Sequence, residues 1–246
     1  MAGSKDQLPF DFDVSKCTNS WTKSEPLPDL AEIYAARQKE TWQQRCWSML
    51  EQVRGFCLQC SMCSLGKNYC TEKDTQFDPH VFSNMKPSQF FVCGQNPGHN
   101  ECLQYEPFVG DAGKFFNNNL IKNGMKREQL YITNVIKCHS INNEAPTYEQ
   151  MIRCKPILQM ELAVLRPKLI ITLGSVAFEA FCPNQQMSKC FGKIIKSEEF
   201  FIDNEGVKVC PIYHPSPRNM NVQDRKEQFL KDIKILCKII RKLEAP

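Results

Sequence analysis

The sequence lacks any long apolar run, and its first thirty residues contain no apolar core. No run reaches the roughly 18 apolar residues that a membrane-spanning helix requires. The polar, proline-containing start of the chain is also unlike a signal peptide. No internal repeat is visible, so we do not expect a repeat architecture. These absences predict an intracellular protein that stays out of the membrane, either cytoplasmic or nuclear.

The composition is that of an ordinary globular protein, apart from its cysteines. The 246 residues are 42% hydrophobic and 24% charged, which suits one domain with extra N-terminal segments. The formal net charge of +4 permits a polyanionic partner but does not require one. Fourteen cysteines are many for a protein of a reducing compartment, where a disulfide framework is not expected. We expect a monomer.

The chain divides into three parts. Residues 1–28 resemble a flexible tail, because they are polar, contain proline and show no periodicity. Residues 29–56 form a helical extension, in which Asp29 and Glu32 predict a capping box and the helix runs from about residue 30 to 53. Residues 57–246 hold the main domain.

The main domain alternates between strand and helix patterns. Four apolar segments have the length of strands: residues 89–93, 130–137, 168–173 and 207–213. Helical patterns cover residues 111–123, 148–165, 175–181 and 221–243, and residues 200–203 suggest a small additional strand. This alternation predicts an α/β fold, a three-layer sandwich with a central four-stranded, mostly parallel sheet flanked by helices.

Polar loops follow three of the predicted strands. Residues 94–99 read Gly-Gln-Asn-Pro-Gly-His, residues 214–219 read His-Pro-Ser-Pro-Arg-Asn, and Asn134 stands at another strand end. The carboxyl edge of a parallel sheet is where α/β enzymes build their clefts. We therefore expect these loops to share one site.

Four cysteines have spacings typical of metal ligands: Cys60, Cys63, Cys138 and Cys154. Thiolates from separated segments ligate zinc or an iron–sulfur cluster, and spacing alone does not separate the two. Cys57 or Cys70 is an alternative to one of the first pair. For the remaining cysteines of the main domain, a buried thiol that packs as a small apolar group is the favoured interpretation.

These motifs, taken in order, resemble the uracil-DNA glycosylase superfamily, and its iron–sulfur branch, family 4, in particular. The resemblance rests on Cys-Ser-Met-Cys at 60–63, Pro-Phe-Val-Gly-Asp-Ala-Gly at 107–113, Thr-Asn-Val-Ile-Lys-Cys at 133–138, the later Cys154, and His-Pro-Ser-Pro at 214–217. It implies a structural [4Fe-4S] cluster on Cys60, Cys63, Cys138 and Cys154, with zinc as the alternative. It also implies DNA, single- or double-stranded, as the partner.

The first motif departs from family 4. That family usually has Gly-Glu-Ala-Pro-Gly, whereas this chain has Gln95 and Asn96 at the second and third positions. Asn96 resembles instead the mismatch-specific and the single-strand-selective monofunctional branches, and the 214–219 motif also resembles the single-strand-selective branch. The basic insertion of a crosslinking relative is absent from residues 141–152, so we do not expect covalent capture of DNA.

The resemblance implies a role for each motif residue in removing a flipped base. Phe108 stacks on the base, and the Asn134 amide pairs with the uracil edge but not with that of cytosine. His214 stabilises the oxyanion of the leaving base. Asn96 holds the hydrolytic water, with help from Gln95.

Two further sets of residues concern the substrate. Gly94 and Gly98 lie at the base, and a glycine at 98 leaves room at the ring's 5-position, which predicts tolerance for 5-hydroxymethyluracil. Ser216, Arg218 and Met220 belong to a loop that would contact DNA or enter the duplex.

We therefore predict a monofunctional DNA glycosylase that leaves an abasic site and initiates base excision repair. No lysine of the motifs suits a Schiff base, and Lys137 fits a structural or phosphate-contact role better, so no lyase activity is expected. The alternatives are a non-catalytic iron–sulfur module that binds damaged or single-stranded DNA, and a zinc-stabilised structural protein.

Overall fold

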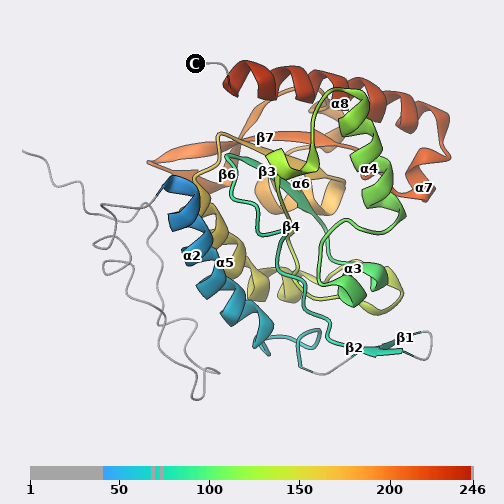
Figure 1. The fold of residues 1–246 in the computed structure, drawn as a ribbon. Helices are drawn as coiled ribbons and strands as arrows, with labels where there is room; N and C mark the ends of the chain where they lie inside the picture. The colour runs from blue at the N-terminus through green and yellow to red at the C-terminus, as the bar shows by residue number, and fades with distance from the viewer. Residues whose placement is uncertain (1–40, 68–69, 73–74, 245–246) are drawn as a thin grey trace, which may run out of the picture.

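The computed structural model describes residues 41–67, 70–72 and 75–244. They form an α/β sandwich of three layers, with one sheet between two layers of helices (Figure 1). No helix in these ranges is both long and apolar enough to cross a membrane. The predicted tail at 1–28 and the Asp29–Glu32 capping box lie outside the described residues.

The central sheet has five strands in the order β4-β3-β5-β7-β6. Its first four strands are parallel: β3 (Phe90–Gly94), β4 (Tyr131–Asn134), β5 (Leu169–Leu173) and β7 (Glu205–Ile212). Their carboxyl ends therefore meet at one edge. The register pairs Gly94 with Asn134 there, so the two loops predicted to share a site do start side by side.

The fifth strand, β6 (Ile195–Ile202), corrects the predicted four-stranded sheet. It pairs antiparallel with β7 through a tight turn in which Asp203 and Asn204 both adopt left-handed backbone conformations. As an edge strand it buries only some of its side chains. Its polar sequence therefore carried little strand signal, and only its end was predicted, as residues 200–203.

Each face of the sheet has its own core. On one face lie α2 (Trp42–Leu58), α5 (Tyr148–Leu165) and α6 (Ser175–Phe181); on the other lie α4 (Asp111–Lys122) and α8 (Gln223–Glu244). Alternate strand residues point to opposite faces, so Phe91 packs with the first layer while Phe90 and Val92 pack with the second. The predicted helices at 111–123, 148–165, 175–181 and 221–243 are thus confirmed within one or two residues.

The N-terminal helix differs from its prediction. Thr41 and Gln44 form the capping box that starts α2, and the helix continues to Leu58 rather than ending near residue 53. Its buried side chains, Leu50 and Cys57 among them, belong to the same core as α5. This described part of the extension is therefore packed against the main domain.

Several short elements complete the chain. They are the hairpin β1 (Cys70–Glu72) and β2 (Thr75–Phe77), the helices α3 (His99–Gln104) and α7 (Pro217–Met220), and the 3-10 turns η2 (Arg127–Gln129), η3 (Ile141–Asn143) and η4 (Met187–Lys189). The segment 78–83 runs along β4 and bridges His80 to Cys138 and Ser83 to Thr133.

A buried ion pair connects β4 to α5. The Lys137 ammonium contacts the Glu161 carboxylate, and both side chains are almost fully buried. Lys137 also donates to the Thr133 hydroxyl at 2.6 Å and to the Asn134 carbonyl at 2.7 Å, while the Tyr131 hydroxyl donates to Glu161 at 2.7 Å. Of the two roles predicted for Lys137, the structural one is confirmed, since its ammonium cannot reach a phosphate from this position.

Breaking this pair should destabilise the fold. Glu161→Leu leaves a buried ammonium without its carboxylate, and we expect the free energy of unfolding in urea to fall by about 3–5 kcal/mol. The double variant Lys137→Met/Glu161→Leu should recover most of that loss. As a matched control, Asp203→Asn removes the exposed pair with Arg166 and should cost less than about 1 kcal/mol. Equal losses for the buried and the exposed pair would contradict this account.

Candidate functional site

Gly94, Asn134 and Phe108 come together where β3 and β4 end, and we call this group of residues, together with His214, the pocket. A methyl group added to Gly94 would approach the Asn134 Oδ1 atom and the Phe108 Cζ atom to 2.5 Å each, so these two side chains converge over the glycine. The Asn134 Oδ1 atom is buried and has no hydrogen-bond partner in the described part of the chain. A buried acceptor without a partner is costly, which favours a donor from a bound ligand.

The loop that carries Phe108 is held by two charged side chains, Glu101 and Arg127. Phe108 has a positive φ of 57°, an uncommon backbone conformation for a bulky residue. The Glu101 carboxylate accepts the backbone N–H groups of Val109 and Gly110 at 3.0 and 2.8 Å. The Arg127 guanidinium donates to the Phe108 carbonyl at 3.2 Å. These contacts fix a strained loop with the aromatic ring against the pocket.

Close packing at a second glycine fixes the same loop. A methyl group at Gly113, in the first turn of α4, would lie 1.8 Å from the Phe108 carbonyl oxygen, so no larger residue fits. Glu101 and Arg127 were not identified from the sequence, because contacts across 8 and 19 residues leave no periodic pattern. Gly113 at least stood inside the quoted 107–113 motif.

His214 reaches the pocket from the end of β7. Its ring centroid lies 6.0 Å from that of Phe108. Gly174, directly after β5, has a φ of +89°, and a methyl group there would come within 3.0 Å of the His214 Cβ atom. Burial lowers the pKa of His214 to about 4, so the imidazole is neutral at physiological pH. Gly174 was missed, although it is a glycine at a strand end like Gly94.

Gln95 and Asn96 form a polar group beside the pocket. The Gln95 side chain donates to the Asn96 Oδ1 atom at 2.8 Å, and the Asn96 Nδ2 group donates to the Ser140 hydroxyl at 3.1 Å. Gly98 is the N-cap of α3, so the first motif ends where a helix begins. Ser140 was not identified from the sequence.

The 214–219 motif continues into the short helix α7. Ser216 is its N-cap, and Arg218 is exposed. Met220 is 8% exposed and belongs to the core beneath α4 and α8. In this conformation Met220 packs against the protein rather than facing a duplex, which argues against it as a wedge.

The predicted ligand cysteines lie in one region, between α2, the start of α5 and the end of the β4 segment. Cys57, Cys138 and Cys154 are buried in one core, and Cys60 packs against it. Burial raises the pKa of Cys138, and charges on the other thiols raise it further. Among the described residues, no three metal-binding side chains converge on one ion position. The side chain of Cys70 lies outside the description.

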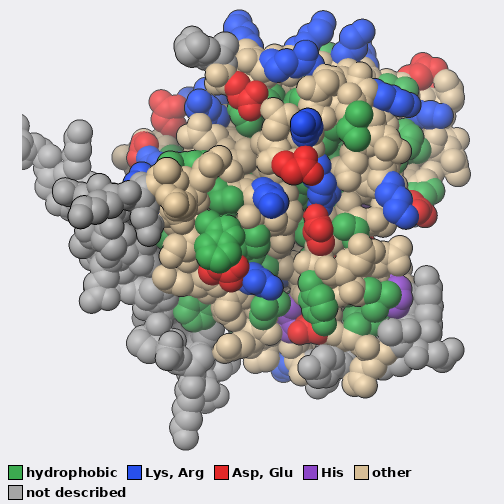
Figure 2. Space-filling view, in the orientation of Figure 1, with side chains coloured by type: hydrophobic (Ala, Val, Ile, Leu, Met, Phe, Trp, Pro, Cys, Tyr) green, Lys and Arg blue, Asp and Glu red, His purple; other side chains and the backbone are tan. Residues whose placement is uncertain are grey.

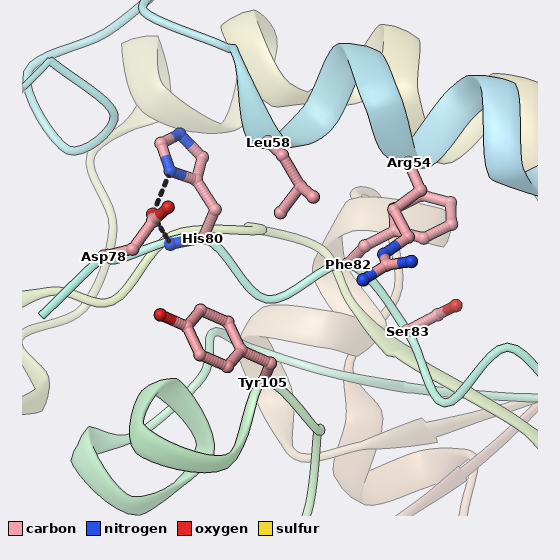
Figure 3. Close-up of a pocket in the computed structure, with 7 residues that line it drawn as sticks. All are labelled: Arg54, Leu58, Asp78, His80, Phe82, Ser83 and Tyr105. Atoms are coloured by element: carbon pink, nitrogen blue, oxygen red, sulfur yellow. Dashed lines mark hydrogen bonds and ion pairs between the residues drawn. The ribbon is translucent and has the colours of Figure 1, made fainter.

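A histidine anchors the first cysteine pair. His80 Nδ1 lies 2.5 Å from the Asp78 carboxylate, and His80 Nε2 lies 2.9 Å from the Cys60 carbonyl oxygen. Asp78 and His80 also line a cavity of about 240 Å³ between α2, the 78–83 segment and Tyr105 (Figure 3). None of the pocket residues Gly94, Phe108, Asn134 and His214 lines it.

The positive charge of the chain is concentrated on α8. This helix carries seven Lys or Arg residues against four Asp or Glu residues. Lys and Arg side chains accordingly gather along the top of the molecule in Figure 2. The helix covers a face of the sheet, whereas the pocket lies at its edge, so net charge does not mark the pocket.

Comparison with known proteins gives consistent matches. The family model described as the Uracil DNA glycosylase superfamily matches residues 82–236. A type-4 uracil-DNA glycosylase of Archaeoglobus fulgidus is 36% identical over 183 residues, covering 72% of this chain and 87% of that protein. One of Sulfurisphaera tokodaii is 31% identical over 196 residues, covering 76% and 84%. A type-5 uracil-DNA glycosylase of Pyrobaculum aerophilum is 32% identical over 100 residues, covering 40% and 41%.

The lowered pKa of His214 has a measurable consequence. In NMR titrations, with His214→Asn used to assign the resonance, its imidazole should titrate near pH 4. The folded-state pKa lies below the ordinary value of about 6.5, so the unfolded chain binds the extra proton first. This site should therefore reduce stability as the pH falls from about 6.5 toward 4. A midpoint near 6.5 would show that the ring is not desolvated.

Proposed function

The chain belongs to the uracil-DNA glycosylase superfamily, with type-4 enzymes among its relatives, and we propose that it hydrolyses the N-glycosidic bond of uracil in DNA. The reaction leaves an abasic site and initiates base excision repair. One observation carries this proposal within the structure. Among the described residues, the buried Asn134 Oδ1 atom has no hydrogen-bond partner, and it lies with the Phe108 ring against Gly94.

Asn134 discriminates between bases through its hydrogen-bonding pattern. Uracil presents an N3–H donor beside its O4 acceptor, which complements an amide oxygen beside an amide nitrogen. Cytosine has an unprotonated N3 and an amino group, so it would place acceptor against acceptor. The Phe108 ring supplies stacking, worth about 1–3 kcal/mol for a base.

His214 stabilises the leaving base. As the glycosidic bond breaks, negative charge develops on uracil O2, and a neutral imidazole N–H donates a hydrogen bond to it. The pKa of about 4 keeps His214 neutral, so it acts as a donor and not as a general acid. Gly174 holds the histidine backbone close to the end of β5.

Asn96 orients the water that attacks the sugar. An amide is a weak base, so the water gains little activation and the reaction must depend on a dissociative, cation-like sugar. We therefore expect slower turnover than an enzyme with a carboxylate at this position. Of the lysines in the described motifs, Lys137 stands nearest to the pocket, and it is buried in its pair with Glu161. Cleavage should therefore stop at the abasic site.

The DNA contacts come from the loop after β7. Exposed Arg218 suits a phosphate or the vacated base position, and Ser216 suits a phosphate. We assign no DNA contact to Met220, since it is buried. Residues 57–246 form the glycosylase domain, and the tail at 1–28 and extension at 29–56 lie outside the family match.

The cysteine group fits a [4Fe-4S] cluster. Its donors are thiols only, they are neighbours, and burial together with their mutual repulsion raises the pKa of Cys60 and Cys138. Bound iron would supply the positive charge that makes such a set of thiolates favourable. Cys60, Cys63, Cys138 and Cys154 would hold the cluster and so connect α2, β4 and α5. Its role is structural.

The proposal is tested by incubating the protein with labelled single- and double-stranded oligonucleotides that carry one uracil. Alkali and a denaturing gel reveal abasic sites. We expect cleavage by the wild type and a loss of about a hundredfold or more in the single-turnover rate for His214→Ala. A folded, iron-loaded wild type that binds these oligonucleotides without forming abasic sites would instead be a DNA-binding module.

The glycine at position 98 should determine the range of bases. We expect excision of 5-hydroxymethyluracil as well as uracil, because a glycine leaves space beside the ring's 5-position. Gly98→Tyr should reduce 5-hydroxymethyluracil excision at least tenfold more than uracil excision, measured as single-turnover rates on matched oligonucleotides. A wild type that rejects 5-hydroxymethyluracil would contradict this assignment.

The cysteine assignment predicts a loss of iron. Cys60→Ser should lower the iron and acid-labile sulfide per chain, the visible absorbance and the urea midpoint together. Cys237→Ser, which replaces a buried core thiol of α8, should lower stability while iron content stays at the wild-type level. Stoichiometric zinc in a colourless wild type would exclude the cluster.

A further inference from the structure

The Asn96 amide is fixed in one orientation by an acceptor on its own loop. Its Nδ2 group lies 3.1 Å from the carbonyl oxygen of Pro97. A carbonyl oxygen can only accept a hydrogen bond, so the side-chain atom facing it must be the nitrogen. The reversed amide would place two oxygens against each other.

Ser140 imposes the same orientation independently. Its hydroxyl donates to the Glu144 carbonyl oxygen at 2.7 Å, which commits its single hydrogen. Toward Asn96, at 3.1 Å, Ser140 can therefore only accept. Ser140 is buried and begins the short turn η3, so the segment 140–144 holds the hydroxyl in place.

The other end of the amide is left for the water. Among the described residues, Asn96 Oδ1 receives one hydrogen bond, from Gln95 at 2.8 Å, and a carbonyl oxygen has two lone pairs. We infer that Ser140 is a positioning residue, which holds Asn96 so that its oxygen, and not its nitrogen, faces the hydrolytic water. This inference rests on the proposed function, because it concerns the same reaction.

The arrangement also explains why position 96 carries an amide. A carboxylate in this place would direct one oxygen at the Pro97 carbonyl and lose the donor that both acceptors require. Ser140 and Pro97 therefore complement the amide nitrogen of Asn96. The amide oxygen, which neither of them contacts, is an acceptor that aligns water without deprotonating it.

Substitution of Ser140 tests the inference through the chemical step. Ser140→Ala should lower the single-turnover rate of uracil excision about tenfold, with the Kd for uracil-containing DNA changed less than twofold. Ser140→Thr, which retains the hydroxyl, should restore the rate to within about threefold of wild type. Iron content should stay at the wild-type level in both variants.

Double-variant cycles separate positioning from a general structural role. In an Asn96→Ala background, Ser140→Ala should lower the rate less than twofold, because the group it orients is gone. In a His214→Ala background it should still lower the rate about tenfold. The matched control is Ser197→Ala, which removes another buried serine that donates to a backbone carbonyl. It should lower the urea midpoint and leave the excision rate unchanged.

An unchanged rate for Ser140→Ala would overturn the inference. The same loss of rate in the Asn96→Ala background as in the wild type would overturn it too. A loss of rate explained by lower iron content would also do so. If instead the proposed function is wrong, the wild type itself will not excise uracil, so the two outcomes are distinguishable.

Discussion

The buried ion pair between Lys137 and Glu161 connects the two functional regions of this protein. On one side, the Lys137 ammonium holds the Asn134 carbonyl, and on the other its backbone N–H lies 3.4 Å from the Cys154 sulfur. The pair thus joins the strand end that forms the pocket to the helix that carries a predicted cluster ligand. A cluster bound there would stabilise the same segments from the opposite side. The cluster would therefore influence the pocket although its own role is structural.

The pocket itself depends on three glycines, which have no side chain. Gly94 lets Asn134 and Phe108 come close to the end of β3, Gly174 lets His214 come close to the end of β5, and Gly113 admits the Phe108 carbonyl. The loop that carries Phe108 is fixed before any ligand binds, since Glu101 and Arg127 hold its backbone. Such preorganisation suits an enzyme that must stabilise developing charge without a strong base.

Sequence patterns predicted the parallel strands and the motif positions well, because buried parallel strands are continuous apolar runs and their loops follow directly. The alternation predicted that the loops after these strands share one edge of the sheet, and the register pairs Gly94 with Asn134 there. The supporting contacts were not predictable in this way. Ser140 reaches Asn96 across 44 residues, and β6 is a polar edge strand whose burial depends on β7. The burial of Met220 was not predictable either, since its place in the loop after β7 said nothing about how its side chain packs.

The most direct test of this account is the single-turnover rate of uracil excision by Gly94→Ala. The added methyl group would come within 2.5 Å of the Asn134 Oδ1 atom and of the Phe108 ring, so the two side chains proposed to bind the base would have to move. We expect at least a hundredfold loss of rate, with iron content and binding of undamaged DNA unchanged. Gly55→Ala, at a glycine with nothing within 4 Å, should keep the wild-type rate. A Gly94→Ala protein as active as the wild type would show that the base does not occupy this pocket.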